Sequence, residues 1–288
     1  MPNNHFLGIL LFVSGWLCSS MGVSQQLDIH SAPVLQAYPF YNPDFIDRMN
    51  VQSIQTVVMY KMPNRTLRKT QQHQVFEFDA LGNVSKYMEY APSGSCKIKS
   101  YFVDRKGRLA TVHLRFEGRN ELASFQYTPD GLVEKKEISN VHDAHLISQE
   151  IFTYEKFSDR QFKRFYLNDE NLTYKYEVVD LDEQGRVTNT RARFIHGVHR
   201  SSTDYGYEGD LLISFARNIR ELTRREEKYV MEYDGHGILQ VAHLWIDAAL
   251  IYRYEYLYED GLMVAILRKE LKSQEIKITK LKYRFYDS

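Results

Sequence analysis

Hydrophobic and polar residues alternate along most of the chain, in short runs that end at evenly spaced turns. Eight turns can be aligned on the residue that opens them, at intervals of about 26 residues. The residues one and three places before each anchor are apolar or aromatic, whereas most of the residues between them are not. Alternation with a period of two is typical of a half-buried strand, so the pattern predicts a strand before each turn. The anchors are Asp79, Asp104, Thr128, Glu155, Asp182, Glu208, Asp234 and Glu259.

Each anchor is expected to open a tight turn into a second strand. In the Asp-x-x-Gly copies the carboxylate can accept from backbone N–H groups further along the turn, and glycine supplies the left-handed conformation. A looser turn then returns the chain, so one repeat is a β-hairpin. The predicted structural turn residues are Asp79, Gly82, Asp104, Gly107, Gly131, Asp182, Gly185, Asp234 and Gly237.

Successive hairpins predict an all-β fold, a long antiparallel meander of about 16 to 18 strands from residues 50 to 288. Such a sheet can curl into a single-layer shell, fold into two packed layers or close into a barrel. We favour the curled sheet or the two layers. A leader segment, 25–49, precedes this domain and includes a short helix that begins after Asn42. Residues 218–229 could form a helix alone, but the repeat period predicts a turn and a strand there.

Two features bear on how the sheet ends. A membrane barrel needs a continuous apolar face on every strand, and residues 66–75 show none in either register.

The last segment, 275–286, carries four Lys and Arg residues, and its alternation slips near Thr279. Charges and bulges protect exposed strand edges from pairing with other chains. The segment is therefore predicted to be an edge strand with a bulge.

The first residues predict export. Residues 6–18 form an apolar run of signal-peptide length, and small residues follow, so residues 1–24 are predicted to be a cleaved signal peptide. No later segment is long and apolar enough for a transmembrane helix. The expected location is the periplasm, the cell surface or the extracellular space. The mature chain keeps one cysteine, Cys96, whose sequence context beside a turn gives it no assigned role.

Composition narrows the classes of partner. The 288 residues contain 37 Lys and Arg and 37 Asp and Glu, which argues against a nucleic-acid partner. Aromatic residues make up 14% of the chain, and many stand just before the turns. The stripe of Tyr252, Tyr254, Tyr256 and Tyr258 could grip a sugar or a peptide, but cross-strand packing in a core explains it better.

The motifs around Asp79-x-x-Gly82 and Asp234-x-x-Gly237, each preceded by an aromatic residue, resemble the YD repeats of Rhs-type proteins. The resemblance covers most of residues 50–288 and implies a long curled β-sheet shell. It implies no activity, because a fold does not determine a function. An arginine directly after the turn glycine occurs at Arg108 and Arg186.

Candidate chemistry is sparse. The turn aspartates provide too few carboxylates at one place for calcium, and His142 with His145, or His196 with His199, provide too few ligands for zinc. We therefore predict no catalytic residues, no metal site and no cofactor. The leading hypothesis is an exported, non-enzymatic β-repeat scaffold or binding module whose partner is an unidentified protein, peptide or glycan. Two alternatives stay open: a hydrolase-like enzyme with a site in the irregular repeat 139–170, around Asp143, and an outer-membrane-associated β-barrel.

Overall fold

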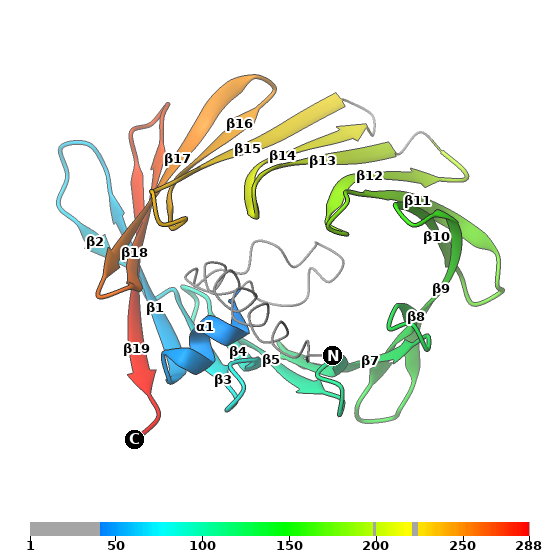
Figure 1. The fold of residues 1–288 in the computed structure, drawn as a ribbon. Helices are drawn as coiled ribbons and strands as arrows, with labels where there is room; N and C mark the ends of the chain where they lie inside the picture. The colour runs from blue at the N-terminus through cyan, green and yellow to red at the C-terminus, as the bar shows by residue number, and fades with distance from the viewer. Residues whose placement is uncertain (1–40, 198–199, 221–223, 288) are drawn as a thin grey trace, which may run out of the picture.

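A computed structural model describes residues 41–197, 200–220 and 224–287, so the predicted signal peptide and most of the leader lie outside the described residues. Within these ranges the chain forms a short helix and 19 strands (Figure 1). The elements are α1 (Pro43–Arg48), β1 (Val51–Lys61), β2 (Arg68–Lys69), β3 (His73–Phe78), β4 (Val84–Tyr90), β5 (Cys96–Val103), β6 (Leu109–Phe116), β7 (Arg119–Tyr127), β8 (Val133–Asn140), β9 (Leu146–Ser158), β10 (Gln161–Leu167), β11 (Thr173–Leu181), β12 (Val187–Phe194), β13 (Arg200–Glu208), β14 (Leu211–Arg220), β15 (Arg224–Tyr233), β16 (Leu239–Ile246), β17 (Ala249–Glu259), β18 (Leu262–Glu270) and β19 (Ile276–Phe285).

The strands form one antiparallel sheet that closes on itself. Successive strands from β3 to β19 pair with each other, and β1 pairs with both β19 and β3. The closed ring has 18 strands, with the two-residue β2 added beside β1. The prediction of an all-β antiparallel meander is confirmed, and closure into a barrel is a more specific form than the curled sheet or the two layers that we favoured.

Closure corrects the prediction of an exposed edge. β19 pairs with β1 from Ile276 to Phe285, and its pairing with β18 runs through Thr279 and Lys280 without a register shift. The predicted bulge there is wrong; the irregularity lies in β1, between Val51 and Ser53. A strand with partners on both sides needs no edge protection. Residues 66–75, which show no apolar face, are mostly outside strands: strand structure there is limited to Arg68–Lys69 and the start of β3.

The short helix α1 and the described residues of segment 218–229 both adopt the structure that the sequence predicts. Asn42 caps α1 with its side-chain oxygen, which accepts from the backbone N–H of Asp44 at 3.1 Å. Phe45 and Ile46 are buried against Ile54 and its neighbours in the main hydrophobic cluster. Six residues are too few for a stable isolated helix, so this packing holds α1 in place. The described residues of 218–229 belong to β14 and β15, as the repeat period predicts.

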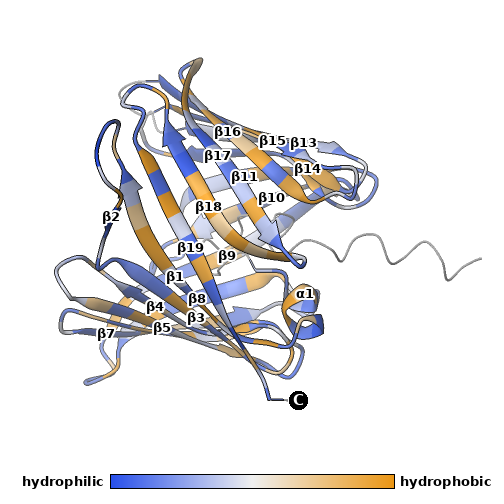
Figure 2. Cartoon of the chain, turned by 90° about the vertical axis from the view of Figure 1, so that its left-hand side faces the viewer, coloured by the Kyte–Doolittle hydropathy of each residue, from blue (hydrophilic) through white to orange (hydrophobic). Residues whose placement is uncertain are grey.

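The barrel wall has two faces that the alternation separates. α1 lies within the outline of the ring in Figure 1, so the face that packs against it, with Ile54, Phe76 and Phe78, is the inner wall. Strand pairing carries this face around the ring, and the apolar residues that precede the anchors all lie on it. The intervening residues face outward, even where they are apolar: Phe102 is 56% exposed. Figure 2 shows the resulting alternation of hydrophilic and hydrophobic residues along the strands.

Tyrosines on the inner wall tie neighbouring hairpins together. The tyrosine just before an anchor donates its hydroxyl to a backbone carbonyl at or near the start of the second strand of the preceding hairpin. Tyr127 donates to Leu109 at 2.7 Å, Tyr154 to Val133 at 2.7 Å, Tyr207 to Val187 at 3.0 Å and Tyr233 to Leu212 at 2.7 Å. Burial raises the pKa of Tyr127, Tyr154 and Tyr207 above the ordinary value. These bonds add a local link between hairpins that pairing alone does not provide.

Candidate anion-binding surface

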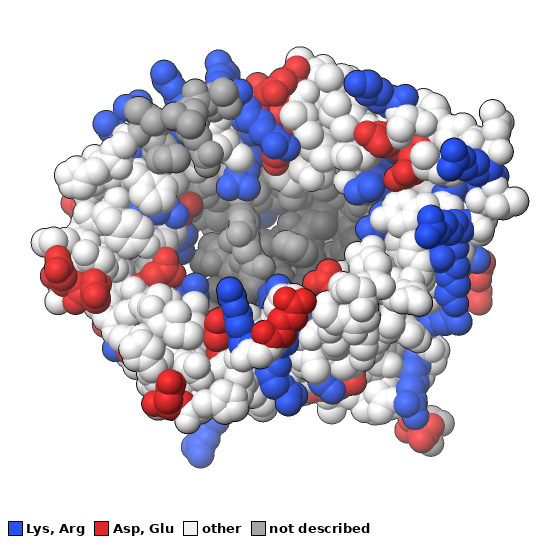
Figure 3. All heavy atoms as spheres, turned by 180° about the vertical axis from the view of Figure 1, so that it is seen from behind, with Lys and Arg blue, Asp and Glu red and all other residues white. Residues whose placement is uncertain are grey.

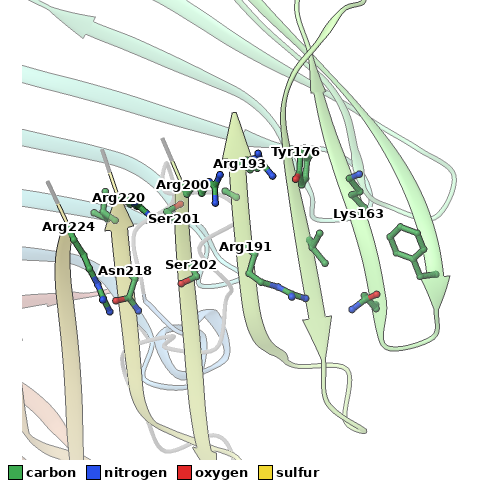
Figure 4. A pocket seen from close by; sticks show the side chains of 15 residues that line it. Lys163, Tyr176, Arg191, Arg193, Arg200, Ser201, Ser202, Asn218, Arg220 and Arg224 are labelled. Atoms are coloured by element: carbon green, nitrogen blue, oxygen red, sulfur yellow. The ribbon is translucent and has the colours of Figure 1, made fainter. Parts of the chain in front are cut away.

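Four arginines form a row across neighbouring strands. Arg193 of β12 lies directly opposite Arg200 of β13, Arg200 opposite Arg220 of β14, and Arg220 opposite Arg224 of β15. All four are exposed. They lie on the outer wall, because Ala192 and Ile219, the adjacent residues in β12 and β14, belong to the inner face. We call these four residues the arginine row (Figure 4).

Two return loops create the row. Arg193 and Arg200 flank the connection between β12 and β13, and Arg220 and Arg224 flank the connection between β14 and β15. Each pair therefore stands near the same end of its hairpin, and the pairing of β13 with β14 sets the two pairs side by side. The sequence analysis missed the row, although arginines at both ends of two successive return loops were a visible signal.

The row lines a hollow of about 1260 Å³ on the surface of the sheet. Its lining extends along β12 to Arg191 and across β11 to Lys163 of β10, and the uncharged Ser202 and Asn218 lie beside the row (Figure 4). The hollow is therefore strongly basic but also contains hydrogen-bonding groups without charge.

Charges in the hollow are poorly balanced. Arg191 is paired with Asp180 at 2.8 Å, whereas the four residues of the arginine row have no carboxylate of the described residues within ion-pair distance. Like charges directly opposite each other on a sheet are destabilising. Four in succession, with no carboxylate partner among the described residues, lower the stability of the fold and create a local positive potential that favours an anion.

The predicted turn residues lie in the tight turns, at the ends of the strands opposite to the return loops, and their aspartates accept hydrogen bonds from the backbone of the same turn. Asp79 accepts from the N–H groups of Leu81 and Asn83, both at 2.9 Å. Asp104, Asp182 and Asp234 make the same two kinds of bond. Gly82, Gly107, Gly131, Gly185 and Gly237 all have φ between 75° and 85°. A return turn, between β10 and β11, has similar geometry: the side chain of Asn168 accepts from Glu170 and Leu172, and Asn171 has φ 58°.

Two of these turns carry an additional arginine. Arg108 Nη2 lies 2.7 Å from Asp104 Oδ2, and its guanidinium stands 4.4 Å from the centre of the Tyr127 ring. Arg186 repeats the arrangement with Asp182 and Tyr207, at 2.7 and 4.4 Å. Hydrogen bonds from Arg108 hold the pKa of Asp104 below its ordinary value. These arginines are engaged within the hairpins and are not free for a ligand.

The histidine pairs do not form a site in the described residues. His142 and His145 lie exposed in the turn between β8 and β9, where their backbone N–H groups bond to Asn140 and Asp143. His196 is exposed, and His199 lies outside the described residues. Across 41–197, 200–220 and 224–287, no three His, Cys, Asp or Glu residues form a group that could hold a metal ion. The irregular repeat 139–170 thus presents a hydrogen-bonded turn.

The tyrosine stripe and the cysteine occupy opposite walls. Tyr252, Tyr254, Tyr256 and Tyr258 lie on the inner wall, where Tyr256 and Tyr258 pack against the main hydrophobic cluster. Burial raises the pKa of Tyr256 to about 12. Cys96 is a half-buried free thiol opposite Tyr90, on the outer wall.

Part of the inner wall is ionic rather than aromatic. Lys136 lies 3.2 Å from Glu150, and Arg164 forms an ion pair with Glu177. Tyr174 donates to Glu150 at 3.0 Å and Tyr166 to Glu177 at 3.1 Å. These charges are paired with one another and hydrogen-bonded to tyrosines, in contrast to the arginine row, although the buried Nε of Arg164 has no partner among the described residues.

Comparison with known proteins identifies no family: no family model matches the chain, and neither does any curated protein. Among solved structures, a porin-like protein from Bacteroides uniformis is similar over 81% of this chain and 96% of its own, at 8% identity and a TM-score of 0.41. A LolA superfamily protein from Nitrosomonas europaea aligns over 83% and 87%, at 9% identity and a TM-score of 0.28. A putative outer membrane lipoprotein-sorting protein domain from Vibrio parahaemolyticus aligns over 85% and 92%, at 11% identity and a TM-score of 0.15.

Similarity at this level does not assign a function. What the chain's own residues define is a closed antiparallel barrel with an unbalanced arginine row on its outer wall.

Proposed function

We propose that the protein is an exported, non-enzymatic β-barrel that acts as a binding module in the cell envelope or outside the cell, and that it binds an anionic partner on the arginine row. The observation that carries the proposal is the row itself: four exposed guanidinium groups, opposite one another on successive strands, without a described carboxylate partner.

The outer wall is too polar to face lipid and is suited to contact with water. A membrane barrel presents an apolar band outward. Here the outer wall carries ion pairs on widely separated strands, including Lys86 with Glu77, Lys135 with Glu137, and Arg253 with Glu255. Figure 3, which looks onto the end of the barrel opposite to that of Figure 1, shows charges of both signs interspersed around this rim as well. A separate observation concerns helices alone: among the described residues, none is long and apolar enough to cross a membrane.

The same hairpins support kinship with Rhs-type YD repeats. The aspartate, glycine and arginine of two turns, together with a tyrosine of the next hairpin, form one repeated unit at Asp104 and again at Asp182. The proposed kinship concerns the way the sheet is built and adds no activity.

Retention on a sulfonate cation-exchange resin tests the function. The protein, purified without detergent, has a formal net charge of zero, so retention near neutral pH requires clustered positive charge. We expect Arg200→Glu to elute at clearly lower salt than the parent protein. The matched control is Arg217→Glu, which makes the same change of net charge on the inner wall of β14.

Equal shifts for the two variants would contradict anion binding by the row, because retention would then follow net charge alone. Insolubility of the folded protein without detergent would contradict the water-exposed outer wall and favour the membrane barrel.

A further inference from the structure

We propose that the arginine row binds an anionic polysaccharide that carries a carboxylate on successive sugars, with the polymer lying across β12 to β15. This inference rests on the proposed function, because it names the class of ligand for the same surface.

The spacing of the row favours a polymer with closely and regularly placed charges. Neighbouring strands lie about 4.8 Å apart, so four arginines opposite one another form a line about 14 Å long. A single small anion would contact only part of this line and leave the other guanidinium groups without a partner. A uronic acid polymer places one carboxylate on each sugar and can engage every arginine in turn.

An acidic peptide fits this line less well. An extended peptide places the side chains of one face two residues apart, at about 6.6 Å, which does not match a strand separation of about 4.8 Å. Carboxylates on consecutive residues of such a peptide would point alternately toward the row and away from it.

The aromatic residues beside the row argue against a single-stranded nucleic acid. Sequence-tolerant binding of single strands uses open aromatic faces on which bases stack. Tyr176, directly opposite Arg193, and Phe165 continue the row across β11 and β10. The Lys163 ammonium stands 4.3 Å from the centre of the Tyr176 ring and 4.5 Å from that of Phe165. The ammonium group stands over the faces of both rings, so these faces are not open for bases to stack on.

Uncharged polar groups adjoin the row on one side. Ser202 and Asn218 lie directly opposite each other, two residues along β13 and β14 from Arg200 and Arg220. Within the described residues, the buried Oδ1 of Asn218 has no hydrogen-bond partner. A buried acceptor without a donor is costly, and most such groups in proteins are satisfied. Ligand hydroxyls next to the carboxylates suit this environment, and polysaccharides supply both.

The test is calorimetric titration of the purified protein with polygalacturonate, a uronic acid homopolymer. The comparison ligands are neutral dextran, galacturonate monomer, poly-glutamate and single-stranded DNA at equal charge concentration. We expect polygalacturonate to bind most tightly and its affinity to fall as salt rises, since ions are displaced on binding. Equal or tighter binding of poly-glutamate or of DNA would overturn the polysaccharide assignment.

Variants locate the site. Arg200→Ala combined with Arg220→Ala should weaken polygalacturonate binding about tenfold, because each exposed ionic contact contributes a few-fold to affinity. Two single controls, Arg115→Ala on the outer wall of β6 and Arg217→Ala on the inner wall of β14, should leave the affinity unchanged. An equal loss with either control would overturn the site. Absence of polygalacturonate binding, with Arg200-dependent retention on the resin intact, would overturn this inference alone; loss of that dependence would overturn the proposed function.

Discussion

Gly82 is needed for a close backbone contact as well as for its turn, unlike the other turn glycines. Its φ is 76°, and a Cβ placed there would lie 2.0 Å from the backbone oxygen of Pro43. Gly107 has nearly the same φ, 75°, but nothing within 4 Å of the added Cβ. The first glycine therefore lets α1 approach the turn between β3 and β4, whereas the second serves only the turn.

Gly82→Ala should lower the free energy of unfolding by clearly more than Gly107→Ala. The left-handed conformation alone costs an alanine about 1–2 kcal/mol at either position, and Gly82→Ala adds the clash with Pro43. Chemical denaturation of both variants measures the difference. Equal losses would show that the contact between α1 and the turn adds nothing to stability.

At the scale of elements, α1 depends on a buried side chain. Ile46 is fully buried in the cluster that joins α1 to the barrel. Ile46→Ala should lower the free energy of unfolding by about 2–5 kcal/mol, the usual cost of truncating a core isoleucine. Ile147, which is 49% exposed, offers the matched control, and Ile147→Ala should change stability little. A small loss for Ile46→Ala would mean that α1 is only loosely attached.

Hairpins were predictable from the sequence because each depends on residues near one another in the chain. An apolar pair, an anchor and a glycine specify a strand and its turn locally, and the inward face of Phe76 and Phe78 follows from the alternation. The arginine row was not predictable in this way. Arg200 and Arg220 belong to opposite strands of one hairpin, and only its register, with an irregularity between Gly206 and Tyr207, sets them side by side.

The whole barrel should lose stability at alkaline pH. Burial raises the pKa values of Tyr174, Tyr205 and Tyr256 from the ordinary value of 10.0 to about 12. Raised pKa values in the folded state mean that stability is fully present below pH 10 and declines as pH rises toward 12. Denaturation midpoints across this range, together with tyrosinate absorbance, measure the effect. Early ionisation of these tyrosines without unfolding would contradict their burial.

Closure of the barrel and the function of the protein depend on residues that are far apart in the chain. Local sequence patterns could therefore not predict them. Nothing within β1 or β19 distinguishes a strand at an open edge from one that meets a distant partner; the positive charges of β19 suited either. The proposed anion-binding surface likewise depends on groups that only the folded barrel brings into one row, such as Arg200 and Arg220.

The pairing of β1 with β19 also sets the order in which the chain can fold. Hairpins between β3 and β19 need only nearby residues and can form early, but the seam joins Val51–Lys61 to Ile276–Phe285 and so comes late. Its entropy cost grows slowly with chain length, yet contacts so distant in sequence slow folding. Until the last strand docks, two strands present unpaired backbone groups to other copies of the chain. A folding molecule is thus most prone to aggregate just before its barrel closes.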